Sequence, residues 1–355
     1  MKVAFYVPIL NIGGYEKVVV NYANYFANKH EVTIVCGIAD GEMKGSISSK
    51  VQIVDLKARA RNLLPALVKW MKKNEPHLFY VPFATYTCMA VIAKKLAKSK
   101  TVIYGVQHGF EKNGTIITWV LKRFVKQADV LGSVSSSVAE YEARRLKIDR
   151  TRYYVFDNPV FAVENLTSLA DCDWLKKDKG AILVTSGRLA KDKHIELPIR
   201  ILAELRKRDK KVSLLILGDG PEKQNLQNLV EQLKLKDFVL FAGYVNNPIA
   251  YISQCDVYMQ TSEIESFGNG VIEAQMCDLP AIVTNCGGPV DLIEDRFGIN
   301  IGDFDDPNVV SNGVEAVCQI IENKRPFSGM KENAKRYNVA NLEEQFFEPY
   351  KKLTR

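Results

Sequence analysis

The chain has 355 residues, 47% hydrophobic and 25% charged, which is the balance of a folded globular protein with room for two domains. Seven cysteines are scattered without a C-x-x-C pair. This favours a reducing, cytoplasmic compartment and argues against disulfides and structural zinc. No uninterrupted apolar run is long enough to cross a bilayer.

The net charge of +7 is unevenly distributed. Residues 1–164 carry 24 Lys and Arg against 13 Asp and Glu, whereas the remainder carries 24 against 28. The segment 57–73 interleaves cations with apolar groups, namely Arg59, Arg61, Lys69, Lys72 and Lys73 with Leu63, Leu64, Leu67, Trp70 and Met71. One interpretation is an amphipathic helix lying on an anionic membrane surface. The other is a core-packing helix with a solvated basic face. Nucleic acid is not expected, because no module for binding it is found.

Short apolar runs alternate with helical patterns along the chain, which predicts two doubly wound α/β domains with parallel sheets. The first series of predicted strands is Lys2–Leu10, Glu31–Gly37, Val51–Leu56, Leu78–Pro82, Thr101–Gln107, Val130–Ser133 and Tyr153–Phe156, with helices at Glu16–Lys29 and Pro65–Asn74 between them. The second series is Gly180–Ser186, Ser213–Gly218, Val239–Ala242, Asp256–Gln260, Ala281–Thr284 and Gly298–Ile301. We therefore expect domains at 1–160 and 178–339, a linker at 161–177, and ligands at the carboxyl ends of the strands, in a cleft between the domains.

Two glycines, Gly13 and Gly14, stand between the first strand and its helix, just before Glu16. Glycine lets the backbone approach a ligand closely, and the free N–H groups of a helix start can hold an anion. The pattern is not the G-x-G-x-x-G of nicotinamide-binding proteins. The two glycines therefore fit two interpretations, a tight turn without a ligand and a loop whose backbone binds phosphate.

The same junction of the second domain carries Gly187, Arg188 and Lys193. A guanidinium and an ammonium at the mouth of a cleft can neutralise a diphosphate. The alternative is that these cations are solvent-exposed charges that bind no ligand. Cations at a helix start oppose the helix dipole, which disfavours this alternative.

The segment 262–274 places Glu265 and Glu273 eight positions apart, with a helix start between them. Its backbone N–H groups would face a phosphate, and its carboxylates would accept hydrogen bonds from sugar hydroxyls. Two solvated glutamates are one alternative, and a glycosidase-like pair of acid and nucleophile is another.

Together with Gly218-Asp219-Gly220-Pro221, these motifs make the chain resemble the retaining GT-B glycosyltransferases of group one, glycosyltransferase family four, over essentially its whole length. The resemblance implies two Rossmann-like domains facing across a cleft, and a final helix, near 340–355, that crosses back to the first domain. It also implies transfer of a hexose or N-acetylhexosamine, from a UDP-linked donor, to a saccharide or lipid-linked saccharide in surface glycan assembly.

The resemblance also implies roles for particular residues. Arg188 and Lys193 would grip the donor diphosphate, Glu273 the ribose, and Glu265 the transferred sugar. His108 matches the family's active-site histidine near the sugar. The implied catalytic set is His108, Glu265, Arg188 and Lys193; the implied donor-binding set is Gly13, Gly14, Gly187, Arg188, Lys193, Glu265, Phe267, Gly268, Asn269, Gly270, Val271 and Glu273. We expect no cofactor and no bridging metal, because side chains and backbone amides supply the positive charge.

Two positions depart from the family pattern, Ser266 and Asp278, where glycines are usual. Neither carries a charge that the chemistry needs, so they put donor identity in doubt more than activity. A sugar-nucleotide epimerase, a phosphorylase and a non-catalytic sugar-nucleotide-binding subunit remain as alternatives. A dehydrogenase is disfavoured because the nicotinamide fingerprint is missing.

Overall fold

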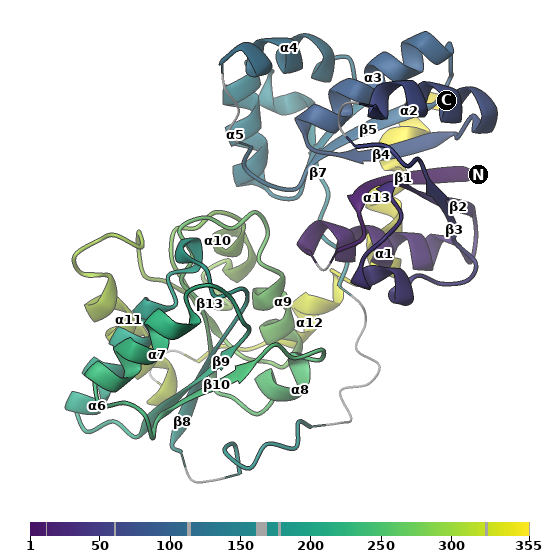
Figure 1. Ribbon diagram of the computed structural model, residues 1–355. Helices are drawn as coiled ribbons and strands as arrows, with labels where there is room; N and C mark the ends of the chain where they lie inside the picture. The colour runs from purple at the N-terminus through teal and green to yellow at the C-terminus, as the bar shows by residue number, and fades with distance from the viewer. Residues whose placement is uncertain are drawn as a thin grey trace. The chain divides into compact units, whose positions relative to one another are not determined.

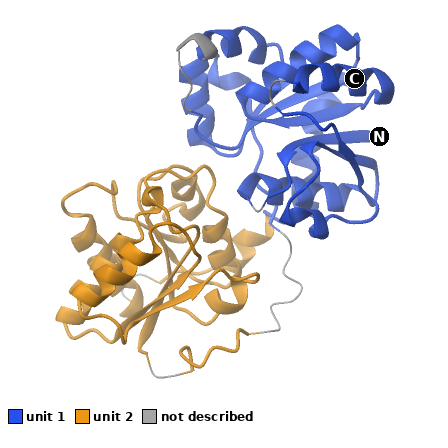
Figure 2. Cartoon of the chain, in the orientation of Figure 1, with its two compact units in different colours: residues 1–161, 337–355 blue, residues 162–336 orange. Residues whose placement is uncertain are grey.

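The computed structural model describes residues 1–11, 13–59, 62–111, 115–160, 169–176, 179–323 and 326–354. The chain forms two compact units (Figures 1 and 2): an N-terminal unit of Met1–Phe161 with Tyr337–Arg355, and a C-terminal unit of Ala162–Arg336. Most of the expected linker, 161–168 with 177, lies outside the described residues. No helix of the described chain has the length and apolar character needed to cross a membrane.

The N-terminal unit contains a seven-stranded parallel sheet in the order β3-β2-β1-β4-β5-β6-β7. Its strands are β1 (Lys2–Ile9), β2 (Glu31–Ile38), β3 (Gln52–Asp55), β4 (Leu78–Pro82), β5 (Val102–Gln107), β6 (Val130–Ser133) and β7 (Tyr153–Val155). Strands β1 and β4 read as continuous apolar runs because both faces of the sheet are covered.

Two helical layers cover this sheet (Figure 1). One layer consists of α1 (Gly14–Phe26) and α13 (Val339–Thr354), whose side chains share a core with β1. The other consists of α2 (Leu63–Asn74), α3 (Ala84–Ala97), α4 (Thr115–Val125) and α5 (Ser136–Leu146). The C-terminal helix therefore belongs to the N-terminal unit, with Phe346 fully buried against Phe5 and Tyr22.

Helix α2 decides between the two interpretations of 57–73. Leu63, Leu67, Trp70 and Met71 are at most 7% exposed and lie in the core of the unit. The hypothesis that these apolar groups enter a membrane is therefore wrong for this fold, because the sheet and α3 already cover them. The basic residues Arg59, Lys69, Lys72 and Lys73 are exposed, and Arg61 lies outside the described residues.

The C-terminal unit contains a six-stranded parallel sheet in the order β10-β9-β8-β11-β12-β13. Its strands are β8 (Ala181–Ser186), β9 (Val212–Leu217), β10 (Val239–Gly243), β11 (Val257–Gln260), β12 (Ala281–Val283) and β13 (Gly298–Asn300). Helices α6 (Glu196–Lys207), α7 (Lys223–Gln232) and α11 (Val309–Ile321) pack on one face. Helices α8 (Ile249–Ile252), α9 (Asn269–Met276), α10 (Gly288–Ile293) and α12 (Met330–Lys335) form a second group that centres on α9.

Candidate functional site

The predicted site residues follow strands on either side of the point where the strand order reverses. In the N-terminal sheet this point lies between β1 and β4, and Gly13 and Gly14 follow β1 while His108 follows β5. In the C-terminal sheet it lies between β8 and β11, with Arg188 after β8 and Glu265 after β11. Such switch points are where doubly wound sheets bind ligands.

Close packing of two loops positions Arg188. Gly218 has φ 140°, and a Cβ there would lie 1.9 Å from the carbonyl oxygen of Gly187. Only glycine fits this approach, which explains the Gly218-Asp219-Gly220 motif. The adjoining Arg188 is exposed, and no described residue forms an ion pair with it. Its guanidinium is available to an anion.

Lys193 and Glu265 meet in the structure. The Lys193 Nζ lies 2.6 Å from Glu265 Oε2, and the two side chains are 21% and 26% exposed. The Thr261 hydroxyl donates to the Lys193 carbonyl at 3.3 Å, and the Glu265 N–H donates to the Cys286 carbonyl at 2.6 Å. Hydrogen bonds to the backbone of Lys193 and Glu265 therefore fix the position of the pair, and both side chains remain partly exposed to solvent.

The start of α9 provides fewer free amides than the sequence suggested. The Val271 N–H donates to the Gly268 carbonyl at 2.9 Å, so a phosphate at this helix start would compete with that bond for the amide hydrogen. Asn269 and Gly270 occupy the first two positions of the helix, where the N–H groups of a helix point out of its start. The Phe267 side chain is 3% exposed, which leaves it only main-chain contact with a ligand.

Glu273 is 7% exposed, so the alternative of two solvated glutamates fails for this residue. It lies close enough to Tyr258 to help burial raise the pKa of that phenol. The Tyr258 hydroxyl lies 2.9 Å from Ser186 Oγ, at the end of β8. A Cβ at Gly270 would lie 2.0 Å from the same hydroxyl, so this glycine allows α9 to approach the sheet.

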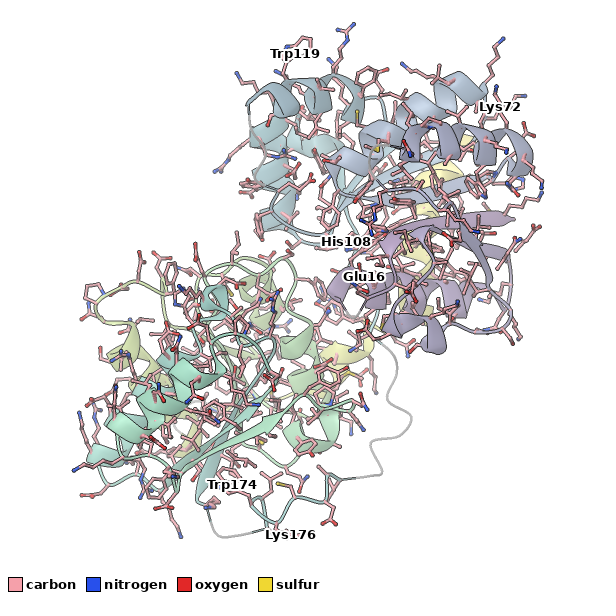
Figure 3. The ribbon with its side chains drawn as sticks, in the orientation of Figure 1. Glu16, Lys72, His108, Trp119, Trp174 and Lys176 are labelled. Carbon is pink, nitrogen blue, oxygen red and sulfur yellow. The ribbon has the colours of Figure 1, made fainter. Side chains whose placement is uncertain are left out.

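In the N-terminal unit, the space around Gly14 is open. A Cβ added there would meet no atom within 4 Å, whereas one at Gly13 would lie 2.2 Å from Glu16 Oε2. Burial raises the pKa of the Glu16 carboxyl above its usual value. Figure 3 shows Glu16 and His108 in the same part of this unit. Ile12 lies outside the described residues.

His108 is surrounded by aromatic side chains. Its Nε2 lies 2.7 Å from the Tyr80 hydroxyl, and its ring centroid lies 4.6 Å from that of Tyr15 and 6.5 Å from that of Phe83. Burial lowers the pKa of His108 to about 3, so the imidazole is neutral near pH 7. A neutral imidazole orients a ligand by hydrogen bonding and adds no charge.

Sequence reasoning missed the residues that surround His108 and the residue that anchors the loop after it. Tyr80 lies within a buried strand, and Phe83 has φ 55°, a strained value for an aromatic residue. Glu111, three residues after His108, accepts the Ala84 N–H at 2.9 Å and lies 3.3 Å from Arg145 Nη2. The one sequence feature that could have pointed to these residues is the short spacing between His108 and Glu111.

Two Asp-x-Asp triplets occur in the chain, at 171–173 and 303–305. Asp171 and Asp173 both pair with Lys176, and Asp303 accepts a hydrogen bond from Asn285 at 3.0 Å. Neither triplet belongs to the residues placed at the switch points. Within the described ranges, no group of three His, Cys, Asp or Glu side chains is arranged to hold a metal ion.

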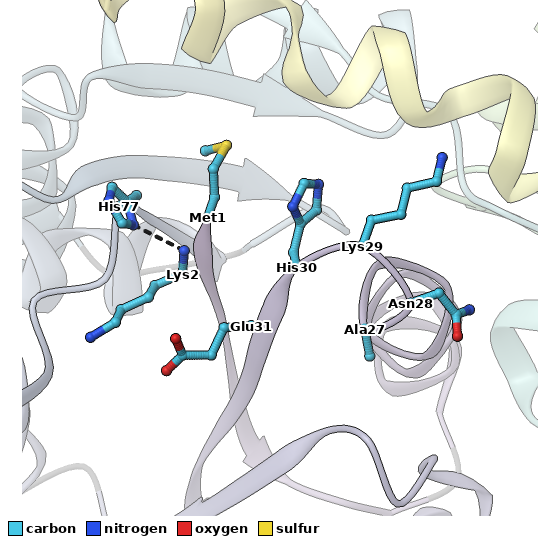
Figure 4. Close-up of a pocket in the computed structure, with 8 residues that line it drawn as sticks. All are labelled: Met1, Lys2, Ala27, Asn28, Lys29, His30, Glu31 and His77. Atoms are coloured by element: carbon cyan, nitrogen blue, oxygen red, sulfur yellow. Dashed lines mark hydrogen bonds between the residues drawn. The ribbon is translucent and has the colours of Figure 1, made fainter.

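A cavity of about 460 Å³ lies elsewhere, at the amino ends of β1 and β2 (Figure 4). Lys2 and Glu31 line it, and the Lys2 N–H donates to His77 Nδ1 at 2.9 Å. Because the switch-point residues follow the carboxyl ends of the strands, this cavity is separate from the predicted site.

The fold of the chain is similar to that of two solved structures. HepE from Anabaena, solved in complex with UDP, superposes with a TM-score of 0.81 at 19% identity, covering 99% of this chain and 100% of that one. The lipopolysaccharide outer core galactosyltransferase WaaB in its apo form gives 0.78, also at 19% identity, covering 99% and 100%. The fold is therefore GT-B.

Sequence comparisons identify the family. The model described as "Glycosyltransferase Family 4" matches residues 12–161, and that described as "Glycosyl transferases group 1" matches 171–337. The chain belongs to the group 1 GT-B glycosyltransferases.

Two relatives from Campylobacter jejuni are similar to the chain. An N-acetylgalactosamine-N,N'-diacetylbacillosaminyl-diphospho-undecaprenol 4-alpha-N-acetylgalactosaminyltransferase is 29% identical over 58% of this chain, and that match spans only 55% of the relative's length. A GalNAc-alpha-(1->4)-GalNAc-alpha-(1->3)-diNAcBac-PP-undecaprenol alpha-1,4-N-acetyl-D-galactosaminyltransferase is 26% identical over 98% of this chain and 97% of its own.

Proposed function

We propose that the chain is a retaining, metal-independent glycosyltransferase that moves a hexose or N-acetylhexosamine from a UDP-linked donor to a saccharide or lipid-linked saccharide in surface glycan assembly. The observation that carries the proposal is the grouping of Arg188, Lys193 and Glu265 at the switch point of the C-terminal sheet. This grouping combines two cations for a diphosphate with a carboxylate for a sugar hydroxyl.

In this mechanism the bond between the anomeric carbon and the diphosphate oxygen breaks first, leaving an oxocarbenium-like sugar. The acceptor oxygen forms its bond on the same face, and its proton passes to the departing diphosphate. Arg188 and Lys193 stabilise the negative charge that develops on the leaving group. Because Lys193 already contacts Glu265, one ammonium can bridge the phosphate and the residue that holds the sugar.

The substrate classes rest on what the relatives are called. The two Campylobacter proteins are named for transfer of N-acetylgalactosamine to undecaprenol-diphosphate-linked saccharides, and HepE was solved with UDP. A lipid-linked acceptor would bring this protein to an anionic bilayer. Since Leu63, Leu67, Trp70 and Met71 are buried and Leu64 is partly buried against the same core, the contact expected through 57–73 needs a different apolar component.

A donor screen tests the proposal. UDP-, GDP- and ADP-linked sugars are compared for their effect on the melting temperature, since a ligand that binds only the native state raises it. A donor that passes is then incubated with saccharide acceptors, and the anomeric configuration of the product is read by NMR. Inversion would contradict retention, isomerisation of the donor without acceptor would identify an epimerase, and binding without turnover would identify a non-catalytic subunit.

A further inference from the structure

Phe83 follows β4 in a backbone conformation that is unusual for a phenylalanine. It has φ 55° and ψ 150° and is the N-cap of α3. This combination lies close to a region that is essentially restricted to glycine, where other residues are strained. Lys98 and Lys147 also cap helices with positive φ, but their ψ values of 34° and 52° belong to the ordinary left-handed region. The conformation of Phe83 is therefore more strained than theirs.

Phenylalanine also contributes nothing to the start of α3 as a capping residue. Serine, threonine, asparagine and aspartate are preferred at an N-cap because their side chains accept a backbone N–H. A phenyl ring cannot make such a bond, and Glu111 from the loop after β5 accepts the Ala84 N–H through Oε2 at 2.9 Å. Glycine or a polar residue in place of Phe83 would therefore serve the local fold better.

Hydrogen bonds from neighbouring elements hold the strained backbone in place. The Phe83 N–H donates to the Val106 carbonyl of β5 at 3.0 Å. The Phe83 carbonyl accepts the Thr87 N–H at 3.0 Å and the Thr87 hydroxyl at 2.8 Å. Glu111, which caps the next residue, lies 3.3 Å from Nη2 of Arg145 on α5. Strain of this kind persists only where the surroundings over-determine it, and it concentrates at functional sites.

The ring of Phe83 lies where the segments that follow β1, β4 and β5 meet. Its centroid is 6.0 Å from that of Tyr15 and 6.5 Å from that of His108, with interplanar angles of 54° and 74°. Tyr15 is 7% exposed, whereas Phe83 and His108 are both partly exposed. Part of the Phe83 ring is therefore apolar surface that a ligand beside His108 can contact.

We propose that Phe83 is a specificity-determining residue whose ring packs against the apolar face of a sugar ring of the acceptor. A hexopyranose carries C–H groups on one face, and packing this face on an aromatic ring removes apolar surface of both from water. The neighbouring His108 can donate a hydrogen bond to a hydroxyl of the same saccharide. The sugar is assigned to the acceptor because Arg188 and Lys193, proposed to bind the donor diphosphate, lie in the other unit. This inference rests on the proposed transferase function.

Stability measurements test the strain. Glycine adopts the observed φ and ψ without strain, whereas alanine keeps the Cβ that is unfavourable there. Phe83→Gly should therefore unfold at a higher urea concentration than Phe83→Ala, the reverse of the usual order for these two residues. If Phe83→Gly is the less stable of the two, the backbone is unstrained and the inference loses its basis.

Transfer kinetics test the ring. With the donor chosen by thermal shift, rates are measured against methyl and octyl glycosides as acceptors, together with hydrolysis of the donor when no acceptor is present. Phe83→Gly should raise the acceptor KM by about tenfold, part of the worth of a buried phenylalanine ring, and leave donor KM and hydrolysis unchanged. Phe83→Tyr keeps the ring and should preserve the acceptor KM. Tyr154→Ala is the control, at a side chain 37% exposed on β7 of the same unit, and should change none of these values.

Three kinetic results would overturn the proposal. An unchanged acceptor KM in Phe83→Gly would mean that the ring touches no acceptor. An equal rise in the donor KM would place the ring against the donor. A loss seen with octyl glycosides and absent with methyl glycosides would assign the ring to a lipid chain.

Direct binding separates this inference from the proposed function. Methyl glycosides of galactose, glucose and their N-acetylated forms are added to the full chain without donor, and their binding is followed by ligand-observed NMR. We expect the wild type to bind at least one of them and Phe83→Gly to bind it more weakly. If this result holds while no nucleotide sugar reacts, the transferase proposal fails and the contact between Phe83 and a saccharide stands. A wild type that binds none of them, or binds them no better than Phe83→Gly, would overturn the inference.

Discussion

The Tyr80 hydroxyl oxygen lies 2.7 Å from Nε2 of His108 and joins a fully buried residue of β4 to the loop that follows β5. Burial holds the pKa of Tyr80 well above its ordinary value, so the phenol keeps its proton. Donation of that proton to Nε2 places the proton of the neutral imidazole on Nδ1. In the tautomer in which Tyr80 donates to Nε2, the nitrogen of His108 that can donate to a sugar is Nδ1.

Tyr80→Phe should lower turnover by about tenfold and leave donor affinity nearly unchanged, because the hydroxyl orients the imidazole and the ring still fills the core. Stability should fall by about 1 kcal/mol, the usual worth of one hydrogen bond. Tyr104→Phe is the matched control, because Tyr104 lies on β5 of the same sheet. Its hydroxyl donates to the Phe346 carbonyl of α13 at 3.2 Å. A similar loss of turnover in both variants would show that the effect is general loosening of the sheet.

The pKa of His108 predicts a dependence of stability on pH. Unfolding returns this pKa from about 3 to the ordinary histidine value near 6.5. Below pH 6.5 the unfolded chain binds a proton that the native chain does not, so the native state loses stability as the pH falls from 6.5 toward 3. Above pH 6.5 this contribution is complete.

We expect His108 to contribute about 2 kcal/mol of this loss between pH 7.5 and pH 5. Urea unfolding of the wild type and of His108→Gln at both pH values measures the contribution. The substituted protein should lose correspondingly less stability on acidification. Parallel losses in the two proteins would mean that His108 is protonated in the native state.

Local patterns in the sequence predicted most of the fold. The thirteen predicted strands all occur, with ends that differ by at most one residue, because continuous apolar runs mark parallel strands with both faces covered. The predicted motifs at Gly13–Gly14, Arg188 and Glu265 follow strands that flank the two switch points, and His108 follows β5, one strand further along, because parallel strands place their carboxyl ends at one edge.

Contacts between side chains far apart in the chain could not be predicted from the sequence. Nothing in the spacing of Tyr80 and His108, or of Lys193 and Glu265, shows that their side chains meet. The environment of α2 was equally hidden, since an amphipathic pattern does not say whether a core or a membrane covers the apolar side. The pairing of the Val271 amide depends on how the first turn of α9 closes, which varies among helix starts.

Chelation should leave transfer intact. In the proposed site, the side chains of Arg188 and Lys193 would supply positive charge to the diphosphate without a bound ion. Transfer rates are compared in buffer, in excess EDTA, and in EDTA followed by excess magnesium or manganese. If activity disappears with EDTA and returns with either metal, the diphosphate is held through an ion and this part of the proposal is wrong.

Gly14→Val should preserve the fold and impair transfer. The open space around Gly14 accepts a side chain, so stability should change by less than about 1 kcal/mol. The added bulk blocks close approach of a ligand to the start of α1. We expect transfer to fall much more than donor affinity, because the proposed donor-binding residues Arg188 and Lys193 lie in the C-terminal unit. Gly45→Val is the control, since Gly45 is also surrounded by open space. Equal losses of affinity and turnover in Gly14→Val would show that this loop binds the donor in its ground state.

Removing either cation of the proposed phosphate grip should impair catalysis more than folding. Arg188→Ala and Lys193→Ala should each cost about 2–4 kcal/mol of transition-state stabilisation, the range found when one charge-stabilising donor is lost.

The stability of both variants should remain close to wild type. Arg188 is exposed, and the Lys193–Glu265 pair is partly exposed, a setting in which an ion pair contributes less than about 1 kcal/mol. Lys191→Ala is the matched control, because Lys191 is an exposed cation of the same short helix. The comparison uses kcat/KM with the best donor and urea unfolding of all three variants. Near-normal rates for Arg188→Ala and Lys193→Ala, or an equal loss in Lys191→Ala, would mean that the diphosphate is held elsewhere.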